Sequence, residues 1–212
     1  MLLRTFALCT AASLACAGAD WIDLTPPDTP LGKEIPGWTR VPIPPVGAVN
    51  ATPQWRVDAA AKMIVCTGQG GHEWLRYDRE FTDFVLQVEW RFAPKEGETR
   101  YNSGIGVRLS RYGEIWYQAQ TGLAGGWLFG VNLAGGELTR VNLREQMKEN
   151  RVKPAGEWNL YEIRAQGDTI TLSVNGAVVN TLTGVALRKG YIGLEAEGYE
   201  IAFRNLRIQP LN

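Results

Sequence analysis

The chain has 212 residues, equal numbers of basic and acidic side chains, and 45% hydrophobic residues. Balanced charge gives no electrostatic reason to bind nucleic acid or an anionic surface. The sequence also lacks a G-x-G-x-x-G motif and a P-loop, so we expect no nucleotide cofactor.

The first 19 residues have the layout of a secretory signal peptide. Arg4 precedes an apolar stretch, and small residues lead up to Ala19. The stretch is too short to span a bilayer, and no later segment predicts a transmembrane span. We therefore expect a secreted or periplasmic protein cleaved after Ala19. A lipid anchor at Cys16 is the disfavoured alternative, because Leu14 lies one position nearer to it than the usual lipobox requires.

Residues 20–53 are rich in proline and show no clear periodicity. They predict an extended leader that packs on the domain through Trp21, Leu24 and Trp38. The prolines in its second half argue against a central strand there. The remaining residues, 54–212, predict one domain of ordinary size.

The clearest strand runs from residue 83 to residue 92. Phe84, Leu86 and Val88 lie on one face, whereas Gln87 and Glu89 lie on the other. Alternation of this length indicates a strand with one face in a core and one face exposed to water or a ligand.

Several further strands and one strong hairpin follow from the sequence pattern. We predict strands at 55–57, 63–65, 103–109, 114–121, 158–165, 169–174, 178–182, 191–196 and 200–208, and a short helix at 142–150. Asn175-Gly176 predicts a tight hairpin turn. Many short strands with few helices are typical of a sandwich or barrel.

Few residues can support catalysis that depends on histidine or cysteine. His72 is the single histidine, so a histidine-rich metal site is excluded, and no G-x-S-x-G motif accompanies it. It is either a solvated loop residue or a residue at the rim of a site. Only Cys66 remains after signal removal, which excludes an internal disulfide and predicts a small buried hydrophobe.

A polar surface would form if the strands at 84–92, 103–109 and 114–121 were neighbours in one sheet. Its members would be Gln87, Glu89, Arg91, Arg108, Trp116, Gln118 and Gln120. Gly104 and Gly106 would leave the middle strand bare, so that a ligand could approach its backbone. Such a surface suits a sugar. An ordinary solvated face with a Glu89–Arg108 ion pair explains the pattern equally well.

Short motifs distributed along the mature chain carry a resemblance to a known family. They include Asp83-Phe84, Glu89-Trp90-Arg91, Asn102-Ser103-Gly104-Ile105, Gly156-Glu157-Trp158-Asn159, Ile192-Gly193-Leu194-Glu195 and Phe203-Arg204-Asn205-Leu206-Arg207-Ile208. In this order the chain resembles the 3-keto-disaccharide hydrolase domain family. The resemblance implies an all-β, concanavalin A-like jelly-roll β-sandwich whose concave sheet binds the ligand. The family often has Tyr-Glu-x-Gln where this chain has an amide, Gln118.

The resemblance implies cleavage of small glycosides that carry a ketone at C3, by base-initiated elimination or hydrolysis. Such a reaction needs one base and a group that stabilises the enolate. We assign Glu89 as the base and Arg108 as the stabiliser. The expected substrate-binding residues are Asn102, Gln118, Gln120, Arg91, His72 and the platforms Trp116 and Trp127. We expect no resident cofactor, although Glu89 and amide oxygens are compatible with a divalent cation.

Three other functions fit the same pattern. A non-catalytic carbohydrate-binding module on the same fold is the main alternative, and the amide at Gln118 favours it. A laminarinase-like hydrolase is a further alternative, but the closely spaced strand carboxylates that it needs are missing from residues 114–120. A structural or adhesion domain is the third.

Overall fold

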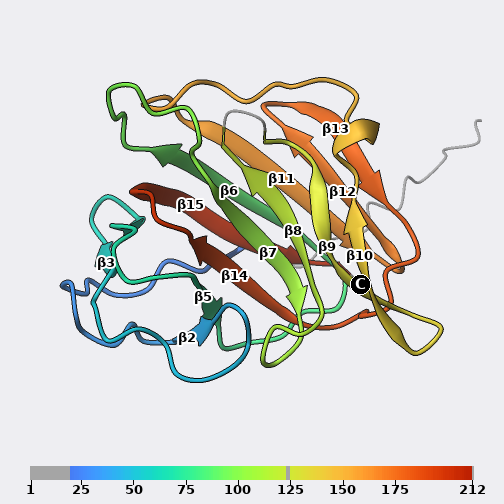
Figure 1. The fold of residues 1–212 in the computed structure, drawn as a ribbon, viewed down its shortest axis with the longest axis horizontal. Coiled ribbons are helices and arrows are strands. Elements are labelled where there is room, and N and C mark those ends of the chain that lie inside the picture. Colours follow the sequence, from blue (N-terminus) through green and yellow to red (C-terminus); the bar gives the residue numbers. More distant parts are fainter. Residues whose placement is uncertain (1–19, 123–124, 212) are drawn as a thin grey trace, which may run out of the picture.

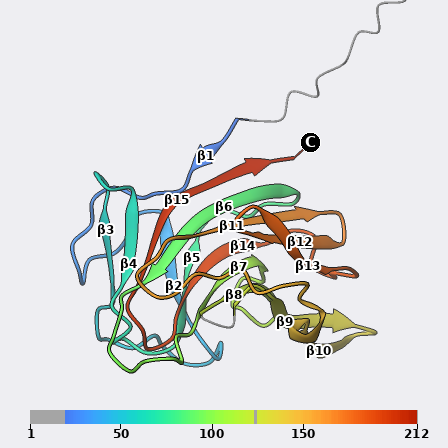
Figure 2. The ribbon, with the colours of Figure 1, turned by 90° about the horizontal axis from the view of Figure 1, so that it is seen from above.

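The computed structural model describes residues 20–122 and 125–211. The predicted signal peptide lies outside these residues. The described chain is a sandwich of two antiparallel β-sheets (Figures 1 and 2), which confirms the all-β jelly-roll prediction. The one helical segment among the described residues is a 3₁₀ turn, η1 (Arg144–Gln146). The described residues contain no helix that could span a membrane.

One sheet has eight strands in the order β13-β12-β11-β6-β15-β4-β3, with β1 paired to β15. The strands are β1 (Ile22–Asp23), β3 (Trp55–Asp58), β4 (Met63–Cys66), β6 (Phe84–Phe92), β11 (Asn159–Gln166), β12 (Thr169–Val174), β13 (Ala177–Leu182) and β15 (Ile201–Pro210). We call its outward surface the back face. The turn between β12 and β13 contains Asn175 and Gly176, both at positive φ, as the predicted hairpin requires.

The other sheet has seven strands in the order β10-β9-β8-β7-β14-β5-β2. The strands are β2 (Trp38–Pro42), β5 (Glu73–Tyr77), β7 (Ser103–Leu109), β8 (Trp116–Thr121), β9 (Leu128–Ala134), β10 (Glu137–Asn142) and β14 (Tyr191–Ala196). We call its outward surface the front face. Because β10 continues to residue 142 and only η1 follows, the predicted helix at 142–150 is wrong.

The core lies between the two sheets and is built from the apolar faces of alternating strands. Trp90 lies there against Phe92 and Tyr161, with ring centroids 5.5 and 5.4 Å away in edge-to-face geometry. The hydroxyl of buried Tyr161 donates to the backbone oxygen of Gln120 over 2.7 Å. This hydrogen bond joins β11 in one sheet to β8 in the other.

A bulge in β7 changes which side chains face the core. Arg108 has a φ of 49°, and the pairing of β7 with β14 shifts register between Tyr191 and Gly193. The extra residue reverses the alternation. Leu109 therefore packs with Trp74 on the front face, whereas Ile105 and Val107 enter the core.

The leader contributes strands as well as extended chain. Leu24 and Trp38 are buried, whereas Trp21 is half-buried. β2 is an edge strand paired only with β5, and Pro42 ends it, in keeping with the tolerance of proline at sheet edges.

Candidate functional site

The topology separates the residues that the sequence predicted to share one surface. β6 belongs to the eight-stranded sheet, whereas β7 and β8 belong to the seven-stranded sheet. The prediction that these three strands are neighbours is therefore wrong. Glu89 and Arg91 lie on the back face, on the far side of the core from Gln118 and Gln120.

Glu89 is held in an ion-pair network on the back face. Its Oε2 accepts hydrogen bonds from Nε and Nη2 of Arg204 over 2.8 and 2.7 Å, and its Oε1 accepts one from Asn205 over 2.8 Å. Burial alone would raise the pKa of Glu89, but these partners outweigh it and hold the pKa below its ordinary value. The neighbouring Arg91 stacks over Trp158, 4.5 Å from the ring. This arrangement does not support Glu89 as the base.

Arg108 is enclosed within the protein. The bulge directs its side chain away from the front face, and none of that side chain is exposed to solvent. Its guanidinium donates to the backbone oxygens of Thr82 and Gly167 and forms an ion pair with Asp83 at 2.9 Å. Arg108 therefore ties three chain segments together, and it does not lie beside Glu89 or Gln118.

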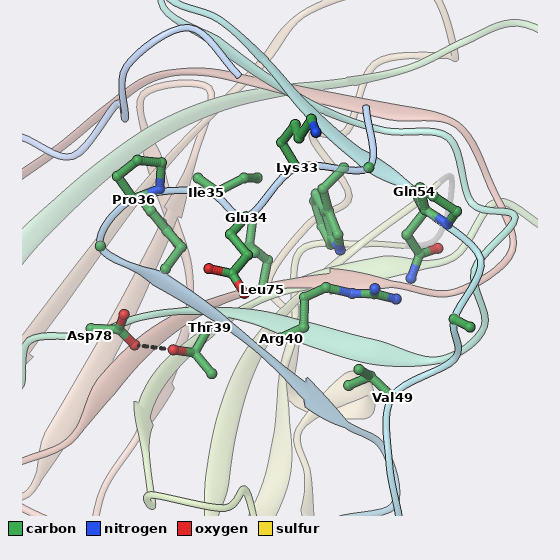
Figure 3. Close-up of a pocket in the computed structure, with 16 residues that line it drawn as sticks. Lys33, Glu34, Ile35, Pro36, Thr39, Arg40, Val49, Gln54, Leu75 and Asp78 are labelled. Atoms are coloured by element: carbon green, nitrogen blue, oxygen red, sulfur yellow. Dashed lines mark hydrogen bonds between the residues drawn. The ribbon is translucent and has the colours of Figure 1, made fainter. Parts of the chain in front are cut away.

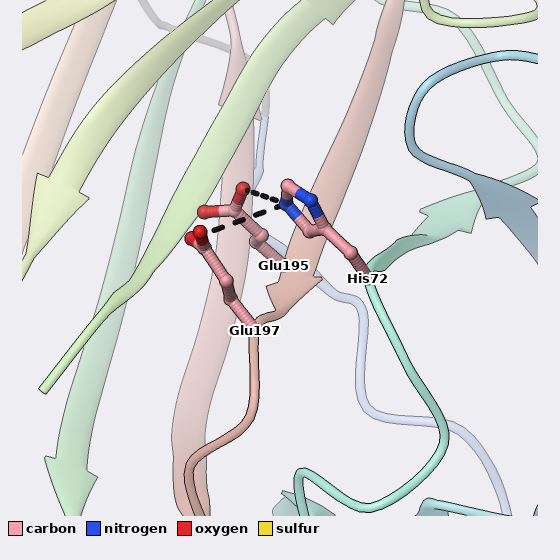
Figure 4. Close-up of side chains that lie close together, drawn as sticks. All are labelled: His72, Glu195 and Glu197. Carbon is pink, nitrogen blue, oxygen red and sulfur yellow. Dashed lines mark hydrogen bonds and ion pairs between the residues drawn. The ribbon is translucent and has the colours of Figure 1, made fainter.

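Four of the predicted site residues do come together on the front face, with two carboxylates that we did not predict. We call this group the polar cluster; its members are His72, Asn102, Gln118, Gln120, Glu195 and Glu197. Nε2 of His72 lies 2.8 Å from Oε1 of Glu195 and 3.9 Å from Oε2 of Glu197 (Figure 4). His72 comes from the loop before β5, Glu195 lies near the end of β14, and Glu197 directly follows that strand.

An amide network holds the buried carboxylate of Glu195 in place. Nε2 of Gln118 donates to Oε2 of Glu195 over 2.9 Å and to Oε1 of Gln120 over 2.8 Å. Gln120 in turn donates to Asn102 and to the backbone oxygen of Ser103. The network therefore fixes Glu195, whose side chain is 6% exposed, against the imidazole.

Glycines in β7 make room for this network rather than for a ligand. A side chain at Gly104 would collide with the amide of Gln118, and one at Gly106 would meet Leu109 and Trp74. The prediction that these glycines expose bare backbone is therefore wrong. They allow the neighbouring side chains to lie flat across the strand.

The electrostatics of the polar cluster suit proton transfer. Burial would lower the pKa of His72, but the hydrogen bond to Glu195 and the charges of both carboxylates outweigh it and raise the pKa above 6.5. Burial and the charge of Glu195 raise the pKa of Glu197, against the opposing effects of His72 and Asn102. Side-chain exposures of 37% for His72 and 34% for Glu197 leave both open to a substrate.

Aromatic side chains continue the front face beside the polar cluster. Trp116 packs against Phe129, with ring centroids 5.1 Å apart, and against Trp74 at 6.2 Å. Trp127 lies next to Gln120, whose backbone N–H donates to the oxygen of Trp127 over 3.0 Å. The predicted platforms are thus on the same face as the cluster, and both are half-buried.

The same three side chains could hold a metal ion. One ligand atom each from His72, Glu195 and Glu197 lies within 4.8 Å of the others (Figure 4). An imidazole with two carboxylates is a donor set that several divalent first-row metals accept. The predicted cation ligand Glu89 is remote from this group.

The buried carboxylate, Glu195, had a signal in the sequence. Along β14, Ile192, Leu194 and Ala196 enter the core, so the alternate residue Glu195 must face outward. What the pattern does not give is the neighbour of β14. Pairing with β5 and β7 brings Glu195 beside His72 and Gln118.

A separate pocket lies at the edge of the sandwich beside β2 (Figure 3). It has a volume of about 730 Å³ and an apolar floor that includes Trp38, Trp55 and Leu75. Arg40 reaches across it, and its Nε donates to the buried carboxylate of Glu73 over 2.7 Å. His72 and Glu197, whose pKa values are both raised, lie instead at the polar cluster.

The fold is a jelly roll, the fold that solved structures of a β-glucanase and a carbohydrate binding module also have. More specifically, the chain belongs to the family of 3-keto-alpha-glucoside-1,2-lyase-like domains, whose model matches residues 20–209. This finding confirms the resemblance seen in the sequence. No curated protein is similar enough in sequence to count as a match.

Solved structures share the fold at low sequence identity. A putative glycosyl hydrolase from Parabacteroides distasonis has a TM-score of 0.59 at 15% identity, over 85% of this chain and 91% of its own. The carbohydrate binding module CBM66 from Bacillus subtilis has a TM-score of 0.57 at 15% identity, over 82% of this chain and 95% of its own. The β-glucanase of Bacillus licheniformis has a TM-score of 0.52 at 13% identity, over 93% of this chain and 100% of its own. These likenesses establish the fold, which hydrolases and binding modules share.

Proposed function

We propose that this protein cleaves glycosides that carry a ketone at C3, by elimination across C1 and C2. The C3 carbonyl acidifies the hydrogen on C2. A base takes that proton, and the electron pair enters an enolate whose charge rests on the C3 oxygen. Re-formation of the carbonyl then expels the C1 substituent, leaving a C1–C2 double bond, and the departing oxygen takes up a proton. Water can add to the double bond later.

In this proposal Glu197 is the base and His72 steadies the enolate. A general base works best when its pKa lies near the working pH, and the pKa of half-exposed Glu197 is raised. Glu195 favours the protonated form of His72, and in that form the imidazole provides a charged donor for the developing oxyanion. Glu195 is buried and acts through His72, as a positioning residue.

A single observation carries the proposal. It is the chain of contacts from Gln118 through buried Glu195 to the only histidine of the protein, with Glu197 beside that histidine. A surface that only binds sugar has no need of a buried carboxylate that keeps an imidazole charged. This elimination requires a base and a donor for the enolate oxygen, and the buried carboxylate orients that donor.

The test compares a 3-keto-glucoside with its parent glucoside, using the mature chain. We expect product only from the keto substrate, and Glu197→Gln should lower kcat by roughly a hundredfold or more, the usual size of a general-base contribution. Glu149→Gln is the matched control, since Glu149 is exposed and contacts Arg151. Full activity of the Glu197 variant, or equal cleavage of both glucosides, would contradict the proposal.

One observation favours a second candidate function, binding without catalysis. Gln118 places an amide where the family often has a carboxylate, and an amide cannot exchange protons. If the protein binds the 3-keto-glucoside and releases no product, with or without added divalent cation, the front face is a binding surface.

Export by the N-terminal signal is a separate part of the proposal. It rests on the sequence of residues 1–19, and a carbohydrate-active domain is consistent with work outside the cytoplasm. N-terminal sequencing of the exported protein should find Asp20 first. A lipidated Cys16 at the N-terminus would show instead that the protein is anchored.

A further inference from the structure

The back face contains a second pocket, on the opposite side of the sandwich from the polar cluster. It has a volume of about 520 Å³. Its lining residues come from β1 and the residue before it, the turn before β4, β6, β11 and β15; they are Trp21, Asp23, Lys62, Gln87, Glu89, Leu160, Asn205 and Arg207. The proposed elimination uses none of them.

A bulge in β15 gives this pocket its side chains. Against β6, the register of β15 shifts between Arg204 and Arg207, and Asn205 has a φ of 51°. The extra residue makes Arg204 and Asn205 point outward in succession, whereas Leu206 enters the core. Both outward residues bind Glu89, which a regular strand would not permit.

The first strand completes the pocket wall. β1 pairs with β15, with Asp23 opposite Arg207, and Nζ of Lys62 lies 2.7 Å from Oδ2 of Asp23. The guanidinium of Arg207 lies 4.6 Å from the ring centroid of Trp21. This contact holds the indole in the wall of the pocket beside Arg207.

The polar groups of the pocket are arranged before any ligand binds. Nε and Nη2 of Arg207 donate to Oε1 of Gln87 over 3.0 and 2.7 Å. Nε2 of Gln87 donates to Glu162 over 2.8 Å. Side chains of three neighbouring strands are thus linked by hydrogen bonds across the back face, with both donors and acceptors among them.

The charge balance selects the ligand class. Two acidic side chains, Asp23 and Glu89, and two basic ones, Lys62 and Arg207, line the pocket. Because these charges cancel, the pocket does not favour a phosphate or another anion. It combines amides, ion pairs and an indole, which suits a neutral molecule with many hydroxyl groups.

We propose that the back-face pocket is a second carbohydrate site, which binds a neutral oligosaccharide through Trp21, Glu89, Asn205 and Arg207. The two sheets of the sandwich then bind sugar on opposite faces. The back-face site would hold the protein on a glycan while the front face acts on a small glycoside. This inference does not depend on the proposed elimination.

The test is an NMR titration of the mature chain with maltohexaose, cellohexaose and laminarihexaose in turn. We expect at least one of these sugars, at up to about 10 mM, to shift the indole N–H signal of Trp21 and the side-chain amide signals of Gln87 and Asn205. Trp21→Ala and the near-isosteric Glu89→Gln should each weaken binding roughly tenfold. Glu197→Gln should bind as the unaltered protein does.

Three results would overturn the inference. The first is that no sugar of the panel shifts these signals. The second is that affinity survives both Trp21→Ala and Glu89→Gln, with folding verified by circular dichroism. The third is that Glu197→Gln abolishes binding, which would place the sugar on the front face. Turnover of the 3-keto-glucoside is measured separately, so failure of either proposal leaves the other standing.

Discussion

Replacing Glu195 by glutamine should remove the charge that keeps His72 protonated. The substitution keeps the shape of the side chain, and the hydrogen-bonding contact to Nε2 of His72 at 2.8 Å can re-form with an amide. We expect the pKa of His72 to fall, because its principal favourable partner is gone. The protein contains one histidine, so its imidazole signals need no assignment.

The size of the stabilisation that Glu195 gives to protonated His72 follows from their contact and from the exposure of the imidazole. A hydrogen bond to a charged group contributes about 1.5–3 kcal/mol. Since the imidazole is 37% exposed, solvent screening should reduce this to about 1 kcal/mol. The pKa of His72 is raised by folding, so this stabilisation is fully present below its ordinary value of 6.5 and is lost as the pH rises through the folded value.

The assay combines an NMR titration of the His72 imidazole with urea unfolding near pH 5 and near pH 9, in buffer with EDTA. Glu195→Gln should cost about 1 kcal/mol more at the acidic pH than at the alkaline pH. Glu149→Gln, on the exposed surface, should change neither measurement. An unchanged or higher pKa of His72 in the Glu195 variant would refute this account of the site.

Three further predictions concern buried groups. Gln118→Glu replaces an amide that donates to Glu195 with a second carboxylate, so urea unfolding should show a loss of roughly 3 kcal/mol near neutral pH that shrinks on acidification; equal stability at both pH values would contradict this. Arg108→Met leaves the partners of a fully buried guanidinium unpaired and should lower the free energy of unfolding by about 3–5 kcal/mol in the same assay. A loss under 1 kcal/mol would count against the role of Arg108 in joining three chain segments. Burial raises the pKa of the Cys66 thiol to about 12, so iodoacetamide near pH 8 should label it only in unfolded protein; mass spectrometry of native samples provides the check.

The sequence predicted most strands because alternation is a local property. The strands at 103–109, 169–174 and 191–196 begin and end where the pattern places them. The pattern could not reveal which sheet each strand joins, since that depends on contacts between distant residues. Glu89 and Gln118 each face outward as predicted, but from opposite sheets.

Two local irregularities also escaped the pattern. The bulge at Arg108 reverses the alternation of β7, and nothing in the types of its neighbours marks the residue for a positive φ. The bulge in β15 involves Asn205, a residue type that adopts this conformation readily, but the sequence alone does not distinguish a bulge from a turn there. Four of the six members of the polar cluster were named from the sequence, whereas Glu195 and Glu197 were not.

The close packing of the Gln118 amide against Gly104 has a consequence for the redesign of this protein. The amide occupies the space that any larger residue at 104 would need. If a variant library changes only one of these two positions, most of its members should have either a steric clash or a cavity there. Productive variants should appear only when both codons change together, so selection experiments on this domain should treat 104 and 118 as a single coupled variable.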